Sequence, residues 1–360
     1  MEESSVGNIR WLAECRTGTA GVGGKAAGLG EMLALGLRVP PGFVITQRAY
    51  EEFVAVAGLG PLLAELAAAA NEPQACNAPA DALRKRIEST PAPDFLAAAI
   101  LDAYDALARS CGMARVSVAV RSSASTEDLP GASFAGQQDT YLGVTRETLL
   151  DAVHKCWASL FSEPAIAYRS QMGYPLAEVW SAIVVQKLVA ARTSGVMFTI
   201  NPVTGNPFEM VIEANWGLGE SVVAGMVVPD RFVVLKSGGV AHRELGVKTQ
   251  AAVVGLGGHR MIDLPPERQS VPCLDDAEIE ELAGLGRLME KHYGEPRDVE
   301  WSVDSELPFP DSVILLQTRP VTTTGLHQWH RSPDRSVTDH ILDMLIGKRS
   351  EDPGRPESGL

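Results

Sequence analysis

Residues 116–144 read VSVAVRSSASTEDLPGASFAGQQDTYLGV, an alternating apolar segment followed by a long loop of small polar residues. Valines alternate with Ser117 and Ala119, and this period of two with β-branched side chains predicts a strand that ends at Arg121. In the loop, closely spaced backbone N–H groups and hydroxyls can surround an anion, and Arg121 can donate paired hydrogen bonds to phosphate oxygens. Ordinary surface loops share this composition. The composition alone therefore leaves two interpretations open, a phosphate site and a plain surface loop.

The order of the residues favours the phosphate site. RSSASTED at 121–128, SFAGQ at 133–137 and the pair Thr140-Tyr141 closely resemble the nucleotide-binding domain that phosphoenolpyruvate synthase, pyruvate phosphate dikinase and rifampicin phosphotransferase share. That domain has the ATP-grasp fold. The resemblance implies an α+β chain of two lobes with mainly antiparallel sheets, and ATP between the lobes.

Length and composition are those of a globular protein. A chain of 360 residues with 45% hydrophobic content is long enough for two or three packed lobes, because single cores stop growing near ~250–300 residues. A formal net charge of −14 argues against nucleic acid or an anionic membrane as the main partner. The five cysteines form no CxxC pair, which favours buried thiols over a zinc site or a disulfide framework. The N-terminus is too acidic and polar for a signal peptide, and no apolar run is long enough to span a membrane, so a soluble cytoplasmic protein is expected.

A glycine-rich segment at 21–30, GVGGKAAGLG, surrounds Lys25 and continues into a helical pattern from Ala26. Lys25 is thus expected at a helix N-terminus, where free N–H groups and the helix dipole attract anions. The Walker A motif fails, because Ala26 stands where Ser or Thr is needed. A formal GxGxxA match lacks both the preceding strand and the later acid of a dinucleotide site. GGKAAGLGEM with VPPGFVIT resembles the opening of the same family, in which this lysine contacts ATP phosphates; the alternative is a solvated lysine at the helix cap.

The middle of the chain is expected to supply packing and the link between the lobes. Residues 47–112 are rich in alanine and leucine and predict a helical insertion. Residues 145–172 predict one helix, on which His154 is expected as a packed or surface residue rather than a catalytic one. The alternating segment 181–189 predicts the strand that connects the lobes. Gln186 on this strand matches a family position that contacts ATP.

A second informative region lies near residue 300. Alternation in RDVEWSVD, 297–304, and in SVILLQTR, 312–319, predicts two strands, each with polar side chains on one face. If the strands pair, Glu300 and Gln317 meet as hard oxygen ligands for Mg²⁺, and Arg319 lies beside them. The same pattern also fits an exposed acidic face with cross-strand charge pairs. DVEW followed by LLQTRP resembles the ending of the family domain and implies the metal site.

By this resemblance the chain has three parts. An N-terminal lobe at 1–185 contains the helical insertion, a C-terminal lobe at 186–325 contains the metal site, and residues 326–360 form a polar tail whose short apolar stripe suits a terminal helix. The connection at 306–311 looks longer than in the family.

The resemblance also implies how Mg-ATP is held. Lys25, Arg121 and Arg319 would clamp the phosphates, which asks mainly for positioning and charge neutralisation. Glu300 and Gln317 would hold Mg²⁺. A close backbone approach and a hydroxyl contact to the triphosphate are implied for Gly136 and Thr140.

The phosphate acceptor is expected on another polypeptide. In phosphoenolpyruvate synthase and its relatives a histidine in a Ser/Thr-His-Ala context accepts phosphate, and none of the seven histidines here stands in that context. The resemblance therefore implies an ATP-binding subunit that transfers the β-phosphoryl group to a histidine of a separate swivelling-domain protein, leaving AMP and phosphate. Phenylphosphate synthase has a subunit of this architecture, so a phenol-like molecule or pyruvate would be the final acceptor. Two alternatives stay open: a stand-alone small-molecule phosphotransferase, and a degenerate regulatory module that only binds ATP.

Overall fold

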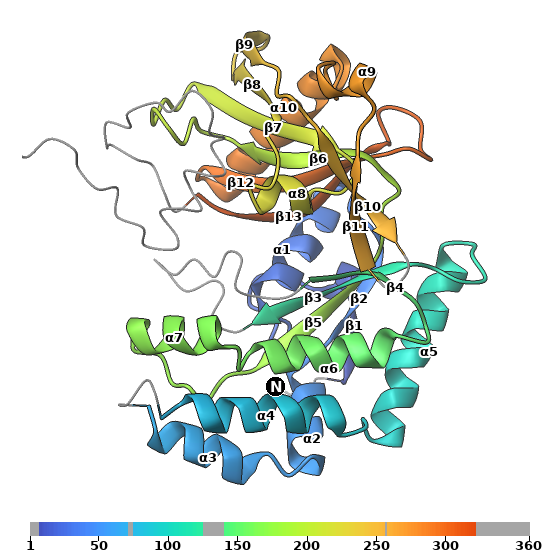
Figure 1. Ribbon diagram of the computed structural model, residues 1–360. Helices are drawn as coiled ribbons and strands as arrows, with labels where there is room; N and C mark the ends of the chain where they lie inside the picture. Colours follow the sequence, from blue (N-terminus) through green and yellow to red (C-terminus); the bar gives the residue numbers. More distant parts are fainter. Residues whose placement is uncertain (1–6, 71–74, 125–139, 256–257, 322–360) are drawn as a thin grey trace, which may run out of the picture.

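The computed structural model describes residues 7–70, 75–124, 140–255 and 258–321, which form two lobes, each built on an antiparallel sheet (Figure 1). The first sheet has five strands in the order β1-β2-β5-β3-β4. Its strands are β1 Ile9–Trp11, β2 Gly42–Ile45, β3 Val118–Ala124, β4 Thr140–Val144 and β5 Ser181–Lys187. Within the described ranges, no helix combines the length and the apolar character that a membrane span requires.

Helices cover the lower face of the first sheet in Figure 1. The expected insertion forms four of them, and two more follow it: α2 Gln47–Val56, α3 Gly60–Ala68, α4 Asn77–Ser89, α5 Asp94–Ser110, α6 Leu149–Ser159 and α7 Glu163–Met172. Alternate residues of the sheet, such as Phe43, Val120 and Val185, are fully buried in the core that these helices complete. The other alternating set therefore faces the second lobe.

The prediction of one helix at 145–172 is wrong, because α6 ends at Ser159 and α7 is a separate helix. Ser162 caps α7 by accepting a hydrogen bond from the backbone N–H of Ala165. Pro164 stands in the first turn, where a missing N–H leaves no helical bond unmade. Apolar residues continue on both sides of the break, so the apolar periodicity alone predicts one continuous helix. The capping residues separate it into two.

The second sheet has six strands in the order β13-β12-β6-β7-β8-β9. Its strands are β6 Ala191–Phe198, β7 Glu209–Trp216, β8 Asp230–Leu235, β9 Val240–Glu244, β12 Arg297–Asp304 and β13 Val313–Pro320. Helix α10, Asp276–Tyr293, covers one face of this sheet, where Trp301 and Ile279 are fully buried in one cluster. Asp275 and Glu278 form a capping box that starts the helix. The opposite face of β12 and β13 carries polar side chains and turns toward the first lobe.

Helix α1, Gly23–Ala34, lies between the two sheets (Figure 1). Its Met32 belongs to an apolar cluster that spans both lobes. The cluster takes Val44 and Val184 from the first sheet, and Val299 and Leu315 from the second. The two lobes therefore share one continuous core.

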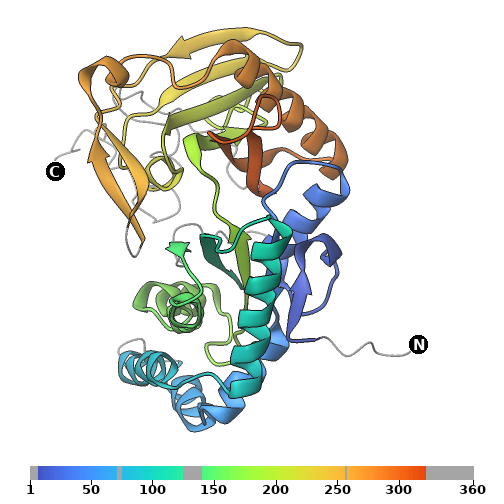
Figure 2. The same ribbon diagram turned by 90° about the vertical axis from the view of Figure 1, so that its right-hand side faces the viewer.

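Two further segments join the lobes. The chain passes from β5 to β6 through residues 188–190, so the expected boundary at 185/186 falls inside β5. A hairpin of β10 Gln250–Gly255 and β11 Gly258–Asp263 leaves the second lobe and packs against β4 of the first (Figure 1, Figure 2). The remaining short elements are η1 Leu12–Glu14, α8 Glu220–Val223 and α9 Pro266–Gln269.

Candidate functional site

Arg121 reaches from the first lobe to the second. Strand β3 places it directly opposite Thr140 of β4, so both side chains lie on the face that looks toward the second lobe. Its Nη2 donates to Oε2 of Glu300 at 2.6 Å and to Oε1 of Gln317 at 2.9 Å. Its Nη1 donates to the carbonyl oxygen of Leu316 at 3.0 Å. One guanidinium group therefore ties β3 to both β12 and β13.

The predicted pairing of the two polar strands is present. Glu300 lies directly opposite Gln317 in the antiparallel pair of β12 and β13, and Asp298 lies opposite Arg319. Arg319 donates from Nε to Oδ2 of Asp298 at 2.7 Å, and its Nη2 forms an ion pair with the same oxygen at 2.7 Å. Asp298 was not among the site residues expected from the sequence. The signal was available, since a residue two positions before Glu300 on a strand shares its face.

Lys25 lies in the first turn of α1, as expected, beside strand β3. Its Nζ donates to the carbonyl oxygen of Ser122 at 2.5 Å. This approach depends on Gly23, which has a φ of 73°: a Cβ there would lie 2.3 Å from the carbonyl oxygen of Ser123. Ser123 Oγ in turn donates to the carbonyl oxygen of Val22 at 3.0 Å. Gly23 thus permits the close packing of α1 against β3 that brings the ammonium group of Lys25 to the strand of Arg121.

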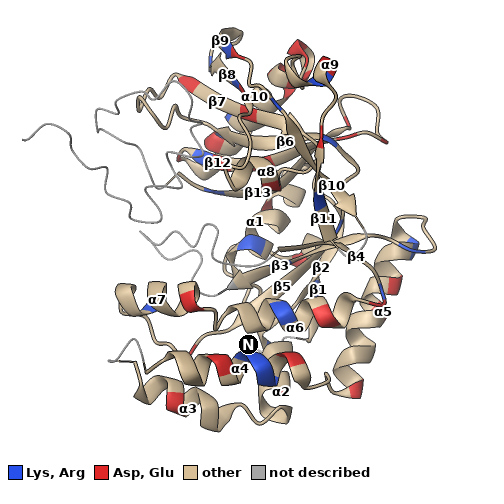
Figure 3. Ribbon diagram, in the orientation of Figure 1, with Lys and Arg blue, Asp and Glu red and all other residues tan. Residues whose placement is uncertain are grey.

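The cluster between the lobes carries a net positive charge. Among the described residues, three cations, Lys25, Arg121 and Arg319, lie near two carboxylates, Asp298 and Glu300, and these five side chains together have a net charge of +1. The whole chain has a formal net charge of −14, with acidic and basic segments spread over both lobes, so this positive cluster is a local feature (Figure 3).

The positive charges keep Glu300 ionised. Burial by itself raises the pKa of Glu300, but the charges of Arg121 and Arg319 outweigh it, and the pKa lies below its usual value. Burial also raises the pKa of Asp298, and there the opposing effect of Arg319 is not enough to cancel it. Glu300 is therefore anionic at neutral pH, among cationic side chains.

Glu300 and Gln317 offer donors that suit Mg²⁺. A carboxylate oxygen and an amide oxygen are hard ligands, and both lie within hydrogen-bonding distance of one nitrogen atom, so a single cation can reach both. In the described part of the chain, no three side chains of the His, Cys, Asp and Glu types cluster as a metal site. A magnesium ion here would take its other ligands from phosphate and water, which it commonly does.

Three further residues were expected at the site: Gly136, Thr140 and Gln186. Gly136 lies outside the described residues. Thr140 shares the interlobe face with Arg121. Gln186 is buried and donates from Nε2 to the carbonyl oxygen of Pro40 at 3.2 Å, so its amide holds the segment before β2 against β5. A contact between Gln186 and ATP stays a prediction.

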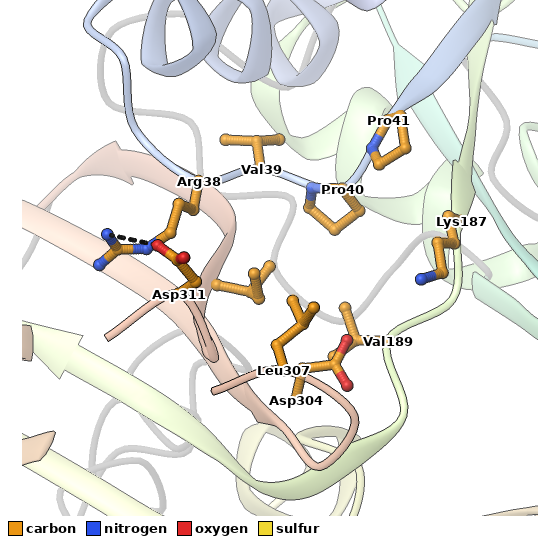
Figure 4. Close-up of a pocket in the computed structure, with 10 residues that line it drawn as sticks. Arg38, Val39, Pro40, Pro41, Lys187, Val189, Asp304, Leu307 and Asp311 are labelled. Atoms are coloured by element: carbon orange, nitrogen blue, oxygen red, sulfur yellow. Dashed lines mark ion pairs between the residues drawn. The ribbon is translucent and has the colours of Figure 1, made fainter. Parts of the chain in front are cut away.

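A pocket of about 300 Å³ lies where the chain crosses between the lobes (Figure 4). Its walls come from segments far apart in the chain and include Val39, Pro40, Lys187, Val189, Asp304 and Ile314. Leu307 and Asp311 border it as well, and both belong to the connection at 306–311 that looks longer than in the family. The pocket could not be predicted from the sequence, because no local pattern indicates that these segments meet.

Two antiparallel lobes with basic side chains and hard oxygen donors between them are the arrangement of an ATP-grasp nucleotide-binding domain. The chain belongs to the family described as pyruvate phosphate dikinase, AMP/ATP-binding domain, whose sequence model matches residues 19–339. The resemblance found in the sequence and the expected fold class are both confirmed.

Curated relatives have the same stretch as part of a longer protein. The phosphoenolpyruvate synthase of Aeropyrum pernix is 40% identical over 345 residues, which cover 88% of this chain and 42% of the relative. The rifampicin phosphotransferase of a Streptomyces species is 44% identical over 312 residues, which cover 85% of this chain and 35% of the relative. The phosphoenolpyruvate synthase of Pyrococcus furiosus is 37% identical over 359 residues, which cover 88% of this chain and 44% of the relative. The chain thus spans less than half the length of these relatives.

Proposed function

We propose that this chain binds Mg-ATP between its lobes and transfers the β-phosphoryl group to a histidine of a separate swivelling-domain protein. One observation carries the proposal: Arg121 of the first lobe lies against the oxygen donors of Glu300 and Gln317 in the second. Relatives named phosphoenolpyruvate synthase and rifampicin phosphotransferase support phosphoryl transfer as the reaction. The matched stretch is less than half the length of each relative, so the complete reaction of those relatives is part of the proposal for this chain.

The residues of the cluster divide the work of phosphoryl transfer. Lys25, Arg121 and Arg319 would bind phosphate oxygens and neutralise their charge, which is most of what this reaction requires from a protein. Held by Glu300 and Gln317, Mg²⁺ would add charge neutralisation at the phosphates. Attack of the histidine nitrogen on the β-phosphorus breaks the bond to the oxygen that leaves with AMP. One water is consumed when the γ-phosphoryl group leaves as phosphate, and the phosphohistidine then phosphorylates a small molecule such as pyruvate or a phenol.

The pocket beside residues 188–190 suits the adenine end of the nucleotide. Val39, Val189 and Ile314 supply apolar surface for a flat ring, and the pocket also holds charged side chains that can recognise ring nitrogens. Thr140, on the face shared with Arg121, would contact the triphosphate.

Isothermal titration tests the first half of the proposal. Wild-type protein should bind Mg-ATP, and Arg319→Ala should weaken binding about tenfold or more, because a charge-assisted contact to phosphate is lost. Arg243→Ala is the control, since Arg243 pairs with the exposed Asp276 on the outer surface and should leave binding unchanged. Failure of the wild type to bind Mg-ATP overturns the proposal.

Labelled ATP tests the second half. With ATP labelled at the β-phosphorus, AMP release and label on histidine should appear only when the swivelling-domain protein is present. AMP release by this chain without any histidine-bearing protein would identify a stand-alone phosphotransferase instead. Tight Mg-ATP binding with no AMP in either mixture would identify a regulatory module.

A further inference from the structure

The guanidinium group of Arg121 contacts the same two oxygen atoms that would bind Mg²⁺. Its Nη2 lies 2.6 Å from Glu300 Oε2 and 2.9 Å from Gln317 Oε1. A magnesium ion bound by these oxygens would stand about 2.0–2.1 Å from each. An ion on the side of the oxygen pair that faces Arg121 would overlap the position of Nη2, and its charge would repel the guanidinium group. The two cations would therefore compete for this oxygen pair.

The other cations of the cluster have different anchors. Arg319 is hydrogen-bonded to Asp298, and the Nζ of Lys25 donates to the carbonyl oxygen of Ser122. Among the described residues of the cluster, Arg121 is thus the cation that contacts both candidate metal ligands. Removal of Lys25 and removal of Arg121 each take away one positive charge near Glu300, but only the second frees its Oε2 atom.

We propose that Arg121 and Mg²⁺ exchange at the Glu300–Gln317 oxygen pair, and that Mg-ATP drives this exchange while free Mg²⁺ does not. The inference rests on the proposed function. Free Mg²⁺ offers no new acceptor to Arg121, whose side chain is only 13% exposed, so displacement would leave a buried guanidinium group without these partners. Mg-ATP brings phosphate oxygens that replace them, and the guanidinium group moves to the nucleotide as the metal takes the carboxylate.

The exchange preserves the link between the lobes. Before it, Arg121 joins β3 directly to β12 and β13. After it, the same strands are joined through the phosphates and the metal. Arg121 thereby holds Glu300 and Gln317 in position and blocks the metal until the nucleotide arrives. This makes the site selective for Mg-ATP over the free ion.

Binding of Mn²⁺ in place of Mg²⁺, followed by electron paramagnetic resonance without nucleotide, tests the exchange. Arg121→Met should bind Mn²⁺ about tenfold more tightly than wild type, because the hydrogen-bonded competitor is gone. Lys25→Met is the matched control: it removes one nearby charge but no hydrogen bond to the ligand pair, and its gain should be clearly smaller. Glu300→Gln in the Arg121→Met background should abolish the gain, which shows that the added metal binds there.

A second measurement uses wild-type protein with ¹⁵N-labelled arginine. The side-chain resonance of Arg121, assigned by its loss in Arg121→Met, should stay in place with free Mg²⁺ and shift with Mg-ATP. The exchange is refuted if wild type binds Mg-ATP but Arg121→Met binds Mn²⁺ no more tightly than Lys25→Met, or if free Mg²⁺ alone shifts the resonance. Absence of Mg-ATP binding by wild type is a separate result, and it counts against the proposed function itself.

Discussion

Substitution of Asp298 by Asn separates two explanations of how the cluster would bind ATP. If the number of charges decides, loss of a carboxylate raises the net charge of the cluster from +1 to +2 and should tighten Mg-ATP binding. If the position of Arg319 decides, loss of its anchor should weaken binding. We expect the second result, because Oδ2 of Asp298 accepts a hydrogen bond from Nε of Arg319 and forms an ion pair with its Nη2, each at 2.7 Å.

The magnitude follows from these contacts. A hydrogen bond between charged groups contributes about 1.5–3 kcal/mol, and the amide of Asn keeps part of it, because it still accepts from the charged guanidinium group but no longer attracts it as an anion. Arg319 is 34% exposed, and solvent screens part of this difference. A loss of about 1–2 kcal/mol remains, which corresponds to roughly 5- to 30-fold weaker Mg-ATP binding.

Isothermal titration of wild type and Asp298→Asn measures this effect, with chemical unfolding as a check that the fold is unchanged. Glu295→Gln is the matched control, because Glu295 pairs with Arg297 at 2.7 Å. Arg297 stacks over the ring of Tyr293 in α10, so this pair lies toward the helix-covered face of β12. Glu295→Gln should leave binding unchanged. Equal or tighter binding by a correctly folded Asp298→Asn would refute the positional explanation.

Two stability predictions accompany this one. Gly30→Ala should destabilise the protein by about 1–3 kcal/mol, since its Cβ would lie 2.0 Å from the carbonyl oxygen of Cys15; Gly28→Ala on the same helix, with 3.6 Å to its nearest neighbour, should be neutral or stabilising by up to about 1 kcal/mol in urea unfolding. Burial lowers the pKa of His154 below its usual value despite Asp151, so the unfolded chain takes up the proton first and stability should fall as pH drops below about 6.5. His154→Gln should flatten the dependence of stability on pH between about pH 5 and 7.5. An unchanged slope would contradict the assignment of this dependence to His154.

The sequence was most informative where alternation and residue chemistry agreed. The alternating pattern assigned Glu300 and Gln317 each to a polar face, and the register of β12 and β13 places them opposite each other. The same pattern placed Asp298 and Arg319, but only a pairing of the strands shows that they meet. Strand alternation is a local property, and the partner of a side chain is not.

Contacts between distant segments were beyond local patterns. Arg121 and Glu300 are 179 residues apart, and the expectation that they come together rested on the family resemblance. Gln186 was expected at the site from its family position, which stays a prediction, and its hydrogen bond to the carbonyl oxygen of Pro40 had no signal in the local pattern. The break before α7 had a local signal in Ser162 and Pro164, and the periodic apolar residues obscured it.

The placement of α1 between the sheets limits how far the two lobes can separate. Because Met32 belongs to a cluster with residues from both sheets, a wide separation of the lobes would divide this cluster and expose apolar surface to water. Small sliding displacements of packed elements cost far less than such a rupture. The two lobes are therefore expected to shift by small sliding motions over the apolar interface at α1. The volume of the side chains on α1 is expected to set how far the lobes can move.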